Sequence, residues 1–297
     1  MTVDASIAEV RRFNRSVTQR VGALNDHYLA RDRTLGASRV LWEIGTEGCE
    51  VRSLRARLEL DSGHMSRLLR VLERDGLVEL APSSQDARIR FARLTERGLA
   101  ERALLDERSD GLARSILGAL DGRQREELVA AMRTVERLMT ASMVELRVVD
   151  PAQPDAQGCL RAYFAELDRR SEIPFDPAKG TSAEPHELRE PAGAFLIAYL
   201  RDEPAGCGAV KHRPDGSSEI KRMWVAESVR GLGIGGRLLS ELERLARDRG
   251  ATAVRLDTNK SLVEAISMYR SRGYREIPRF NEEPFAHHWF EKSLAGT

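Results

Sequence analysis

The chain has 297 residues, a formal net charge of +1 and three cysteines, a length that predicts two domains. The near-zero net charge excludes a globally basic protein, so any nucleic-acid-binding surface has to be local. The odd number and wide spacing of the cysteines indicate no metal site but free thiols in a reducing cytoplasm, and the charged N-terminus predicts neither a signal peptide nor a membrane span.

The first half of the chain begins with predicted helices. Apolar residues at spacings of three and four predict a helix over residues 5–31. Further helices are expected from Arg39 to Ile44 and from Val51 to Leu58. The three segments together predict a mainly α-helical domain.

A second group of elements follows a tight turn. Asp61 is expected to cap a helix from Ser62 to Arg74, which Gly76 ends. One side of this helix is apolar and the other carries small polar and basic residues. A short helix, a turn and a second helix of this kind are typical of a helix-turn-helix motif, whose second helix enters the major groove of DNA.

A β-hairpin is predicted after the helix-turn-helix. Strands at residues 78–81 and 89–94 flank a polar loop, and the sequence Asp86-Ala87-Arg88 is followed by Leu94-Thr95-Glu96-Arg97-Gly98. This hairpin and the helix before it resemble the winged helix of MarR-type regulators. Ala87 stands where many of those proteins have a further arginine, which removes one possible phosphate contact.

The resemblance implies binding to double-stranded DNA with a palindromic operator. The expected DNA-contacting residues are Ser62, His64, Ser66, Arg67, Arg70, Asp86, Arg88 and Arg90, with Asp86 orienting Arg88 towards a minor groove. Long helical patterns over residues 98–120 and 121–144 imply a homodimer in such proteins. The alternatives are a winged helix that serves only protein contacts, and helices that pack only within the chain.

The segment from Val149 to Asp155 contains two prolines and is predicted to join the domains, which gives expected bounds of 1–148 and 149–297. After it, a helix is expected from Gly158 to Arg170. Strands are expected at residues 193–201 and 205–212, joined by a turn at residues 202–204.

A glycine-rich turn organises the second half. The segment Ile220 to Val225 predicts a strand, and it is followed by Arg230, Gly233 and Gly235 in the arrangement RxxGxG and then by a helical leucine pattern. Glycines allow a ligand to approach the backbone, and the first N–H groups of a helix can bind phosphate. Downstream come a strand at 253–257, a helix at 262–272 and a strand that opens at Gly273-Tyr274.

In combination with Asn259, Ala265, Tyr269 and Gly273-Tyr274, this turn resembles the GNAT acetyltransferases. The resemblance implies an α+β fold with a mixed, mostly antiparallel central sheet, and acetyl-CoA as cofactor. The expected cofactor-binding residues are Met223, Trp224, Val225, Arg230, Gly231, Leu232, Gly233, Ile234, Gly235, Gly236, Asn259, Ala265 and Tyr269.

Two residues are predicted to carry the chemistry. An amine must lose a proton before it attacks a thioester, and Glu219 is the candidate base because period-2 alternation would place it on the same face as Val225. The resemblance assigns Tyr269 as the acid that protonates the departing thiolate. The alternatives are a solvent-facing or positioning glutamate and a tyrosine that only fills the core.

The sequence therefore predicts a MarR-like winged-helix regulator fused to an acetyl-CoA-dependent N-acetyltransferase that acts by direct attack on a primary amine, expected to be a small molecule. The alternatives are a protein N-acetyltransferase, a transcription factor whose second domain only senses acetyl-CoA or a ligand, and an enzyme whose winged helix only dimerises. The expected location is the cytoplasm, without membrane association.

Overall fold

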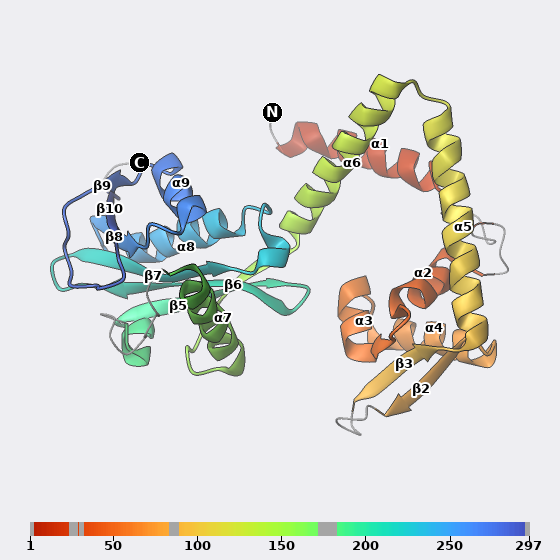
Figure 1. Ribbon diagram of the computed structural model, residues 1–297, viewed down its shortest axis with the longest axis horizontal. Coiled ribbons are helices and arrows are strands. Elements are labelled where there is room, and N and C mark those ends of the chain that lie inside the picture. The colour runs from red at the N-terminus through yellow and green to blue at the C-terminus, as the bar shows by residue number, and fades with distance from the viewer. Residues whose placement is uncertain (1–2, 24–28, 30–32, 83–88, 172–182, 295–297) are drawn as a thin grey trace. The chain divides into compact units, whose positions relative to one another are not determined.

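The fold is described from a computed structural model, which describes residues 3–23, 29, 33–82, 89–171 and 183–294. The chain forms two compact units that divide between Ala131 and Met132 (Figure 1). None of the described helices is long and apolar enough to cross a membrane.

The first unit is mainly helical. Its elements are α1 (Val3–Arg20), α2 (Leu35–Ile44), β1 (Cys49–Glu50), α3 (Val51–Leu58), α4 (Ser62–Arg74), β2 (Val78–Pro82), β3 (Arg90–Leu94), α5 (Glu96–Gly118) and the start of α6 (Gly122–Ser142). The three strands form an antiparallel sheet in the order β1-β3-β2. The prediction of one helix over 5–31 is wrong in length, because Gly22 adopts a φ of 70° and the helix has ended at Arg20.

Local signals fix the bounds of α4. The Asp61 side chain accepts a hydrogen bond from the backbone N–H of His64 at 2.8 Å, as expected for an N-cap. Met65, Leu69 and Leu72 are buried in the core of the unit, each at most 1% exposed. The apolar stripe of α4 therefore faces inward, and its polar side faces away from the core.

The start of α5 is held against the end of α4. Thr95 caps α5 by accepting from the N–H of Gly98 at 3.0 Å, and its hydroxyl donates to the carbonyl of Gly76 at 2.7 Å. A Cβ atom on Gly98 would lie only 2.0 Å from the carbonyl oxygen of Leu77. Glycine is therefore required at this contact between helix and hairpin.

The second unit is an α+β domain. Its elements after α6 are β4 (Val144–Val149), α7 (Pro154–Arg170), a 3₁₀ turn (Pro185–Leu188), β5 (Gly193–Leu200), β6 (Glu203–His212), β7 (Ser217–Val225), a second 3₁₀ turn (Glu227–Val229), α8 (Ile234–Asp248), β8 (Ala253–Thr258), α9 (Val263–Ser271), β9 (Arg275–Glu276) and β10 (His288–Ser293). Among the described residues these strands form a seven-stranded sheet in the order β4-β5-β6-β7-β8-β10-β9. Its recorded strand pairs are antiparallel except β7–β8, so the expected mixed, mostly antiparallel sheet is confirmed.

Helices cover both faces of this sheet (Figure 1). On one face, α8 and α9 bury a core that includes Leu238, Leu242 and Ile266. On the other face, α7 packs over Phe195 and Cys207. The sheet is thus buried on both sides at its centre.

Two details differ from the predicted elements. The β5–β6 turn consists of Arg201 and Asp202, both at positive φ (54° and 62°), and β6 has already begun at Glu203, so the predicted turn at 202–204 was placed late. At one edge of the sheet, β4 pairs with β5, so the sheet of the second unit begins at Val144. The predicted domain boundary between residues 148 and 149 stays a prediction, although most of β4 lies before it.

Candidate functional site

A pocket of about 90 Å³ opens where two strands of the second unit separate. β7 and β8 pair in parallel from Ser217/Ala253 to Glu219/Arg255, and no further pair between them is recorded in the described chain. The pocket is lined by residues of α7, β7, β8, α9 and the segment before β10: Tyr163, Leu167, Ser171, Ile220, Lys221, Arg222, Met223, Asp257, Thr258, Asn259, Leu262, Ala265, Tyr269, Glu283, Phe285 and Ala286. The separation of paired strands thus creates the hollow that the site occupies.

A β-bulge shapes β7 at this pocket. Arg222 has a φ of 58°, and the pairing of β6 with β7 shifts register between Cys207 and Ala209. The thiol of Cys207 donates to the carbonyl oxygen of Arg222 at 3.3 Å. On the facing strand, a Cβ on Gly208 would lie 2.7 Å from the sulfur of Met223 and 2.9 Å from Leu242, so glycine leaves room for these two side chains.

The bulge changes which residues share a face of β7. Ile220, Met223 and Val225 all contact the core under α8. Glu219 neighbours Ile220 in the regularly paired part of the strand, so its side chain points to the opposite face. The prediction that Glu219 and Val225 share a face is therefore wrong, because the extra residue of the bulge shifts the alternation.

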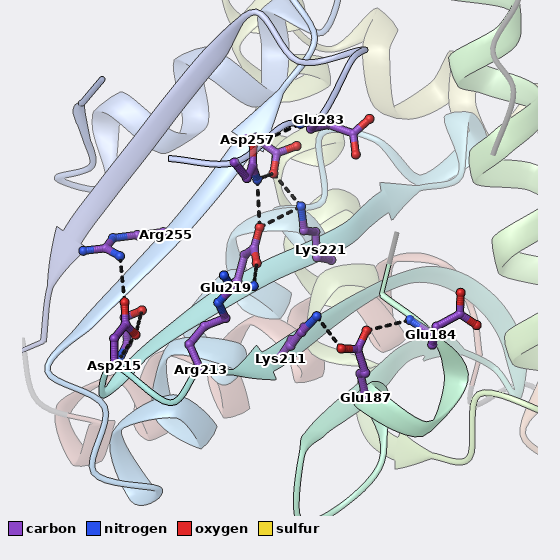
Figure 2. Close-up of polar contacts among 12 residues, drawn as sticks. Glu184, Glu187, Lys211, Arg213, Asp215, Glu219, Lys221, Arg255, Asp257 and Glu283 are labelled. Carbon is purple, nitrogen blue, oxygen red and sulfur yellow. Dashed lines mark hydrogen bonds and ion pairs between the residues drawn. The ribbon is translucent and has the colours of Figure 1, made fainter. Parts of the chain in front are cut away.

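Three largely buried charged side chains and the more exposed Arg213 form a charge cluster beside the pocket (Figure 2). The ammonium of Lys221 lies 2.5 Å from Oδ2 of Asp257 and 2.8 Å from Oε1 of Glu219. The guanidinium of Arg213 lies 3.4 Å from Oε2 of Glu219. Burial alone would lower the pKa of Lys221, but the Asp257 and Glu219 carboxylates outweigh it and raise that pKa, so the lysine stays charged at neutral pH.

Asn281 completes this cluster. Its amide nitrogen donates to Oε1 of Glu219 at 3.1 Å and to Oδ2 of Asp257 at 2.9 Å, while its amide oxygen accepts from the indole of Trp289 at 2.8 Å. Both recorded bonds of Asp257 use Oδ2, so within the described chain Oδ1 has no donor. Asp257 lines the pocket and Glu219, only 4% exposed, does not.

Tyr269 lies at the same pocket. The residue is 4% exposed, and its ring lies 5.8 Å from that of Tyr274 and 6.1 Å from that of Phe290. Burial raises the pKa of its hydroxyl well above the ordinary value, so the group is protonated at physiological pH. The described residues provide no hydrogen-bond partner for this hydroxyl. It is therefore a neutral donor at the pocket wall.

The predicted glycine-rich turn leads into α8. Gly231 and Gly233 have φ values of 83° and 77°, and Gly233 is the N-cap of the helix. The first N–H groups of α8 have no partners within the helix, as at any helix start. A Cβ on Gly235 would lie 3.3 Å from the sulfur of Met268, so the helix start packs closely against α9.

Other predicted cofactor residues have protein partners. Arg230 donates to both carboxylate oxygens of Glu166 at 2.6 Å and to the carbonyl of Val225 at 3.2 Å. The indole of Trp224 also donates to Glu166, at 2.9 Å. Asn259 donates to the carbonyl of Phe285 at 2.9 Å and its amide oxygen accepts from the N–H of Ser261. The pocket brings together Met223, Asn259, Ala265 and Tyr269, but Trp224, Val225 and the glycine-rich turn are not among the residues that line it.

Sequence reasoning missed the polar residues Lys221, Arg222, Asp257 and Asn281. Glu219 and Lys221 have opposite charges and lie two residues apart on one strand, a pattern that indicates an ion pair. Asp257 was also visible as a single acidic residue at the end of an apolar strand. Nothing in the local pattern around Asn281 indicates that it reaches β7 and β8.

In the first unit, α4 presents a polar face. Ser62, His64, Arg67 and Arg70 are exposed, and Ser66 is half-buried. Within the described chain, neither Arg67 nor Arg70 has a carboxylate partner. The exposed Arg90 lies at the start of β3 and pairs with Pro82. The other predicted wing residues, Asp86 and Arg88, lie outside the described residues.

Two family models match the chain. That of the acetyltransferase (GNAT) family matches residues 160–274, and that of the MarR family matches residues 32–89. The chain joins a MarR-family segment to a GNAT-family segment. The MarR segment contains α2 to α4, and the GNAT segment contains most residues of the β7–β8 pocket, among them Tyr269 and Asp257.

Curated relatives match less than a third of the chain. An IAA acetyltransferase of Azospirillum brasilense is 37% identical over 90 residues, which are 30% of this chain and 59% of that protein. The uncharacterized N-acetyltransferase YjcF of Bacillus subtilis (strain 168) is 31% identical over 82 residues, 28% of this chain and 56% of that protein. The matches thus span less than two thirds of the length of these relatives.

Solved structures match about half of the chain. A GNAT-family acetyltransferase of Staphylococcus aureus Mu50 aligns with a TM-score of 0.44 and 17% identity, covering 50% of this chain and 99% of that one.

Proposed function

We propose that the GNAT segment is an acetyl-CoA-dependent N-acetyltransferase that acts on a primary amine of a small molecule. The observation that carries the proposal is the meeting of two complementary groups in one pocket. Tyr269 contributes a buried, protonated hydroxyl, and Asp257 contributes a carboxylate oxygen without a donor among the described residues. Such a pair suits a reaction that protonates one atom and deprotonates another.

The residues fit acetyl-CoA at the start of α8. Gly231 and Gly233 adopt positive φ where the chain enters the helix. Nothing lies within 4 Å of a Cβ built on either residue, so the space beside this turn is open. Within the predicted stretch from Gly231 to Gly236, the N–H of Leu232 donates to the carbonyl of Val229 at 3.4 Å. The unpaired N–H groups at the helix start, including that of Ile234, would bind the pyrophosphate, because such amides favour anions. Arg230 comes directly before this stretch and is held by Glu166.

Acetyl-CoA supplies the acetyl group as a thioester. The amine nitrogen attacks the carbonyl carbon, so that a C–N bond forms and the C–S bond breaks. In this proposal Tyr269 gives its proton to the departing sulfur, and Asp257 binds the ammonium and accepts a proton from it. The nitrogen loses two protons in the reaction: the one that Asp257 accepts passes to the solvent, and the one lost after the attack replaces the proton that Tyr269 gave to the sulfur.

Glu219, the base expected from the sequence, receives a different role in this proposal. Its carboxylate is bound by Lys221, Arg213 and Asn281, and it does not line the pocket. We assign it to the positioning of Lys221 and Asn281, which in turn hold Asp257. Glu219→Gln should therefore reduce turnover less than Asp257→Asn, and the pH dependence of kcat/KM should change only in the Asp257 variant.

The deciding experiment is thiol release from acetyl-CoA by the full chain with amines, amino acids, polyamines, aminoglycosides and lysine peptides. Tyr269→Phe should lower kcat about 100-fold, the lower range for loss of a general acid, with little change in KM. Tyr274→Phe is the matched control, since that hydroxyl donates to Glu243 at 3.0 Å and is not among the residues lining the pocket. Equal activity of Tyr269→Phe and wild type contradicts the assignment, and acetylation of lysine peptides alone would replace the small-molecule acceptor by a protein.

Binding of acetyl-CoA without turnover on any acceptor would support a ligand sensor in place of an enzyme. Calorimetry with acetyl-CoA separates this outcome from loss of binding. The proposed chemistry predicts that Tyr269→Phe binds acetyl-CoA as the wild type does.

A second proposed function is DNA binding by the MarR segment, and the exposed side of α4 favours it. Arg67 and Arg70 lie there among small polar groups, without carboxylate partners in the described chain, as expected for residues that contact phosphates and bases. Exposed apolar residues along α1 support a homodimer, which would read a palindromic operator: Ile7 is 47% exposed, Val10 56%, Phe13 46% and Val17 39%. The protein would then act in the cytoplasm as both regulator and enzyme.

The test is a binding titration on fragments of the DNA around its own coding region, at several salt concentrations. Replacing a phosphate-contacting arginine should weaken binding and reduce the salt slope by about one. Arg67→Ala and Arg70→Ala are the test variants, and Arg114→Ala is the control, because Arg114 pairs with Asp110 on exposed α5. Absence of specific binding by the wild type would support a winged helix that only dimerises, and unchanged binding in both test variants would contradict the assignment of the contact to α4.

A further inference from the structure

We infer that the amine acceptor also carries a carboxylate, and that Arg222 is the residue that binds it. The inference rests on the proposed acetyltransferase function, because it concerns the acceptor of that same pocket. It assigns the acceptor to the chemical class of amino acids and related amino carboxylates.

The first observation is the position of Arg222 in the bulge. In a regular strand, Lys221 and Arg222 would point to opposite faces of the sheet. Arg222 instead has a φ of 58°, and both residues line the pocket. A non-glycine residue in this left-handed region is uncommon, and such residues are found in turns and at ligand-binding and active sites. The bulge thus brings a second cationic residue to the pocket.

The second observation is the difference between these two cations. Lys221 is fully engaged with Asp257 and Glu219 (Figure 2). Arg222, in contrast, has no carboxylate partner within the described chain. Its positive charge is therefore available to a ligand, whereas the charge of Lys221 is balanced within the protein.

The third observation is how Arg222 is held. Its guanidinium carbon lies 4.6 Å from the ring centre of Phe164 and 5.9 Å from that of Tyr163, which itself lines the pocket. Stacking uses the flat faces of a guanidinium and leaves the N–H groups at its edge free to bind a carboxylate through two parallel hydrogen bonds. The two rings from α7 therefore orient Arg222 without occupying its donors.

The pocket then offers two opposite charges to one small ligand. Asp257 provides a carboxylate oxygen for the ammonium, and Arg222 provides a guanidinium for an anion. A simple amine would leave Arg222 without a counterion inside the pocket. An amine with a carboxylate satisfies both residues.

A phosphate of acetyl-CoA is the competing source of the anion. The start of α8 already offers backbone N–H groups to the pyrophosphate, whereas Arg222 lies on the bulge of the strand before it. Kinetics distinguish the two sources. A residue that binds the acceptor changes KM for the acceptor, and one that binds the cofactor changes KM for acetyl-CoA.

The experiment compares the proteinogenic amino acids with their primary amides as acceptors for the full chain. The paired compounds keep the amine and the side chain and differ in the carboxylate. Arg222→Asn removes the guanidinium and keeps a residue that tolerates positive φ. Arg222→Lys keeps the charge without the two-pronged geometry. Arg244→Asn is the control, because Arg244 pairs with Glu241 and Asp248 on the exposed side of α8.

For the wild type we expect kcat/KM to be about 10- to 100-fold higher for at least one amino acid than for its amide, the range for a charged hydrogen-bonded pair. Arg222→Asn should remove this preference, Arg222→Lys should restore part of it, and neither should change KM for acetyl-CoA. Equal use of acid and amide by the wild type overturns the inference. So does a preference that survives in Arg222→Asn, or a change confined to KM for acetyl-CoA.

A protein without turnover on any amine would refute the proposed enzyme, and binding then tests the inference separately. Calorimetry of the same amino acids and amides with the protein saturated with coenzyme A measures affinity without chemistry. Affinity for an amino acid that Arg222→Asn lowers 10-fold or more upholds the ligand class for a sensor, by the same hydrogen-bond range. Absence of binding by every amino acid overturns it.

Discussion

Replacing Lys221 by methionine tests whether the charge cluster of the pocket is a coupled, buried unit. Methionine keeps the length of the side chain but removes the ammonium that lies between Asp257 and Glu219. Removing one partner of a buried ion pair costs about 3–5 kcal/mol, because the remaining charge stays buried. The Lys221 side chain is 11% exposed, so solvent screens little of this effect. Since Asn281 and Arg213 still bind the two carboxylates, we expect the lower end, about 3 kcal/mol in the free energy of unfolding.

The measurement has to follow the second unit alone, since two units need not unfold in one transition. Trp224 and Trp289 lie in the second unit, whereas Trp42 lies in the first. In a Trp42→Phe background, tryptophan fluorescence during urea unfolding therefore reports on the second unit. The Lys221 variant should show a lower midpoint with an unchanged slope.

Lys211→Met is the matched control. Lys211 lies on the neighbouring strand β6 and pairs with Glu187 at 2.5 Å, but that glutamate side chain is 25% exposed and also accepts from the N–H of Glu184. A pair of this kind contributes at most about 1 kcal/mol. Equal effects of the two substitutions, or a loss below about 1 kcal/mol for Lys221→Met, would refute the reasoning that Lys221 neutralises a buried cluster.

Three further predictions follow from single contacts. The folded state raises the pKa of Lys221 above its ordinary value of 10.5, so the contribution of the charged lysine to stability is complete below that pH and is lost as pH rises through the folded value. The difference in the free energy of unfolding between wild type and Lys221→Met, measured by urea unfolding, should therefore be constant from neutral pH to pH 10 and shrink above it. The hydrogen bond from the His64 N–H lowers the pKa of Asp61 below 3.8, so the capping contribution of this carboxylate is present above that pH and is lost as pH falls through the folded value. Asp61→Ala should lower the melting temperature of the first unit at pH 7 and weaken the proposed DNA binding. The change in melting temperature, measured by circular dichroism, should be smaller at pH 2. Gly98→Ala should destabilise the first unit by more than about 2 kcal/mol, because the added Cβ would lie 2.0 Å from the carbonyl oxygen of Leu77 and the backbone has to move. At Gly111 nothing lies within 4 Å of an added Cβ, so equal free energies of unfolding for Gly98→Ala and Gly111→Ala in chemical unfolding would contradict this prediction.

The elements that the sequence predicted well are those whose signals are local. Asp61 marks the start of α4 and Gly76, with a φ of 67°, follows its end. The strands of the hairpin and strands β5 to β8 were predicted from short runs between turn residues, whereas β4 was not predicted. The prediction failed at Gly22, where a single residue at positive φ ends α1 although the apolar spacing continues beyond it. Periodicity shows which face a helix would bury and does not show where the backbone turns.

The candidate site was predicted in part for a related reason. Tyr269 and Asn259 belong to a motif with fixed spacing, so the sequence could predict that both residues lie near β7. Asn281 lies far from Glu219 in the sequence, and its bond to that residue exists only because the segment before β10 returns to the strands. A single sequence contains no signal for such a contact.

The bulge at Arg222 shows how one local irregularity changes the chemistry that a sequence is expected to support. Strict alternation placed Glu219 beside Val225 and made it the base of the reaction. A single residue at positive φ shifts the alternation at position 222, so that Glu219 no longer shares a face with Val225. Glu219 binds Lys221 in the cluster, and Asp257 of the neighbouring strand lines the pocket. The same irregularity turns Arg222 into a ligand-binding candidate rather than an ordinary strand arginine. The bulge is a feature of the pairing between β6 and β7, where the register shifts between Cys207 and Ala209 and the thiol of Cys207 donates to the carbonyl of Arg222, so the pattern of one strand does not reveal it.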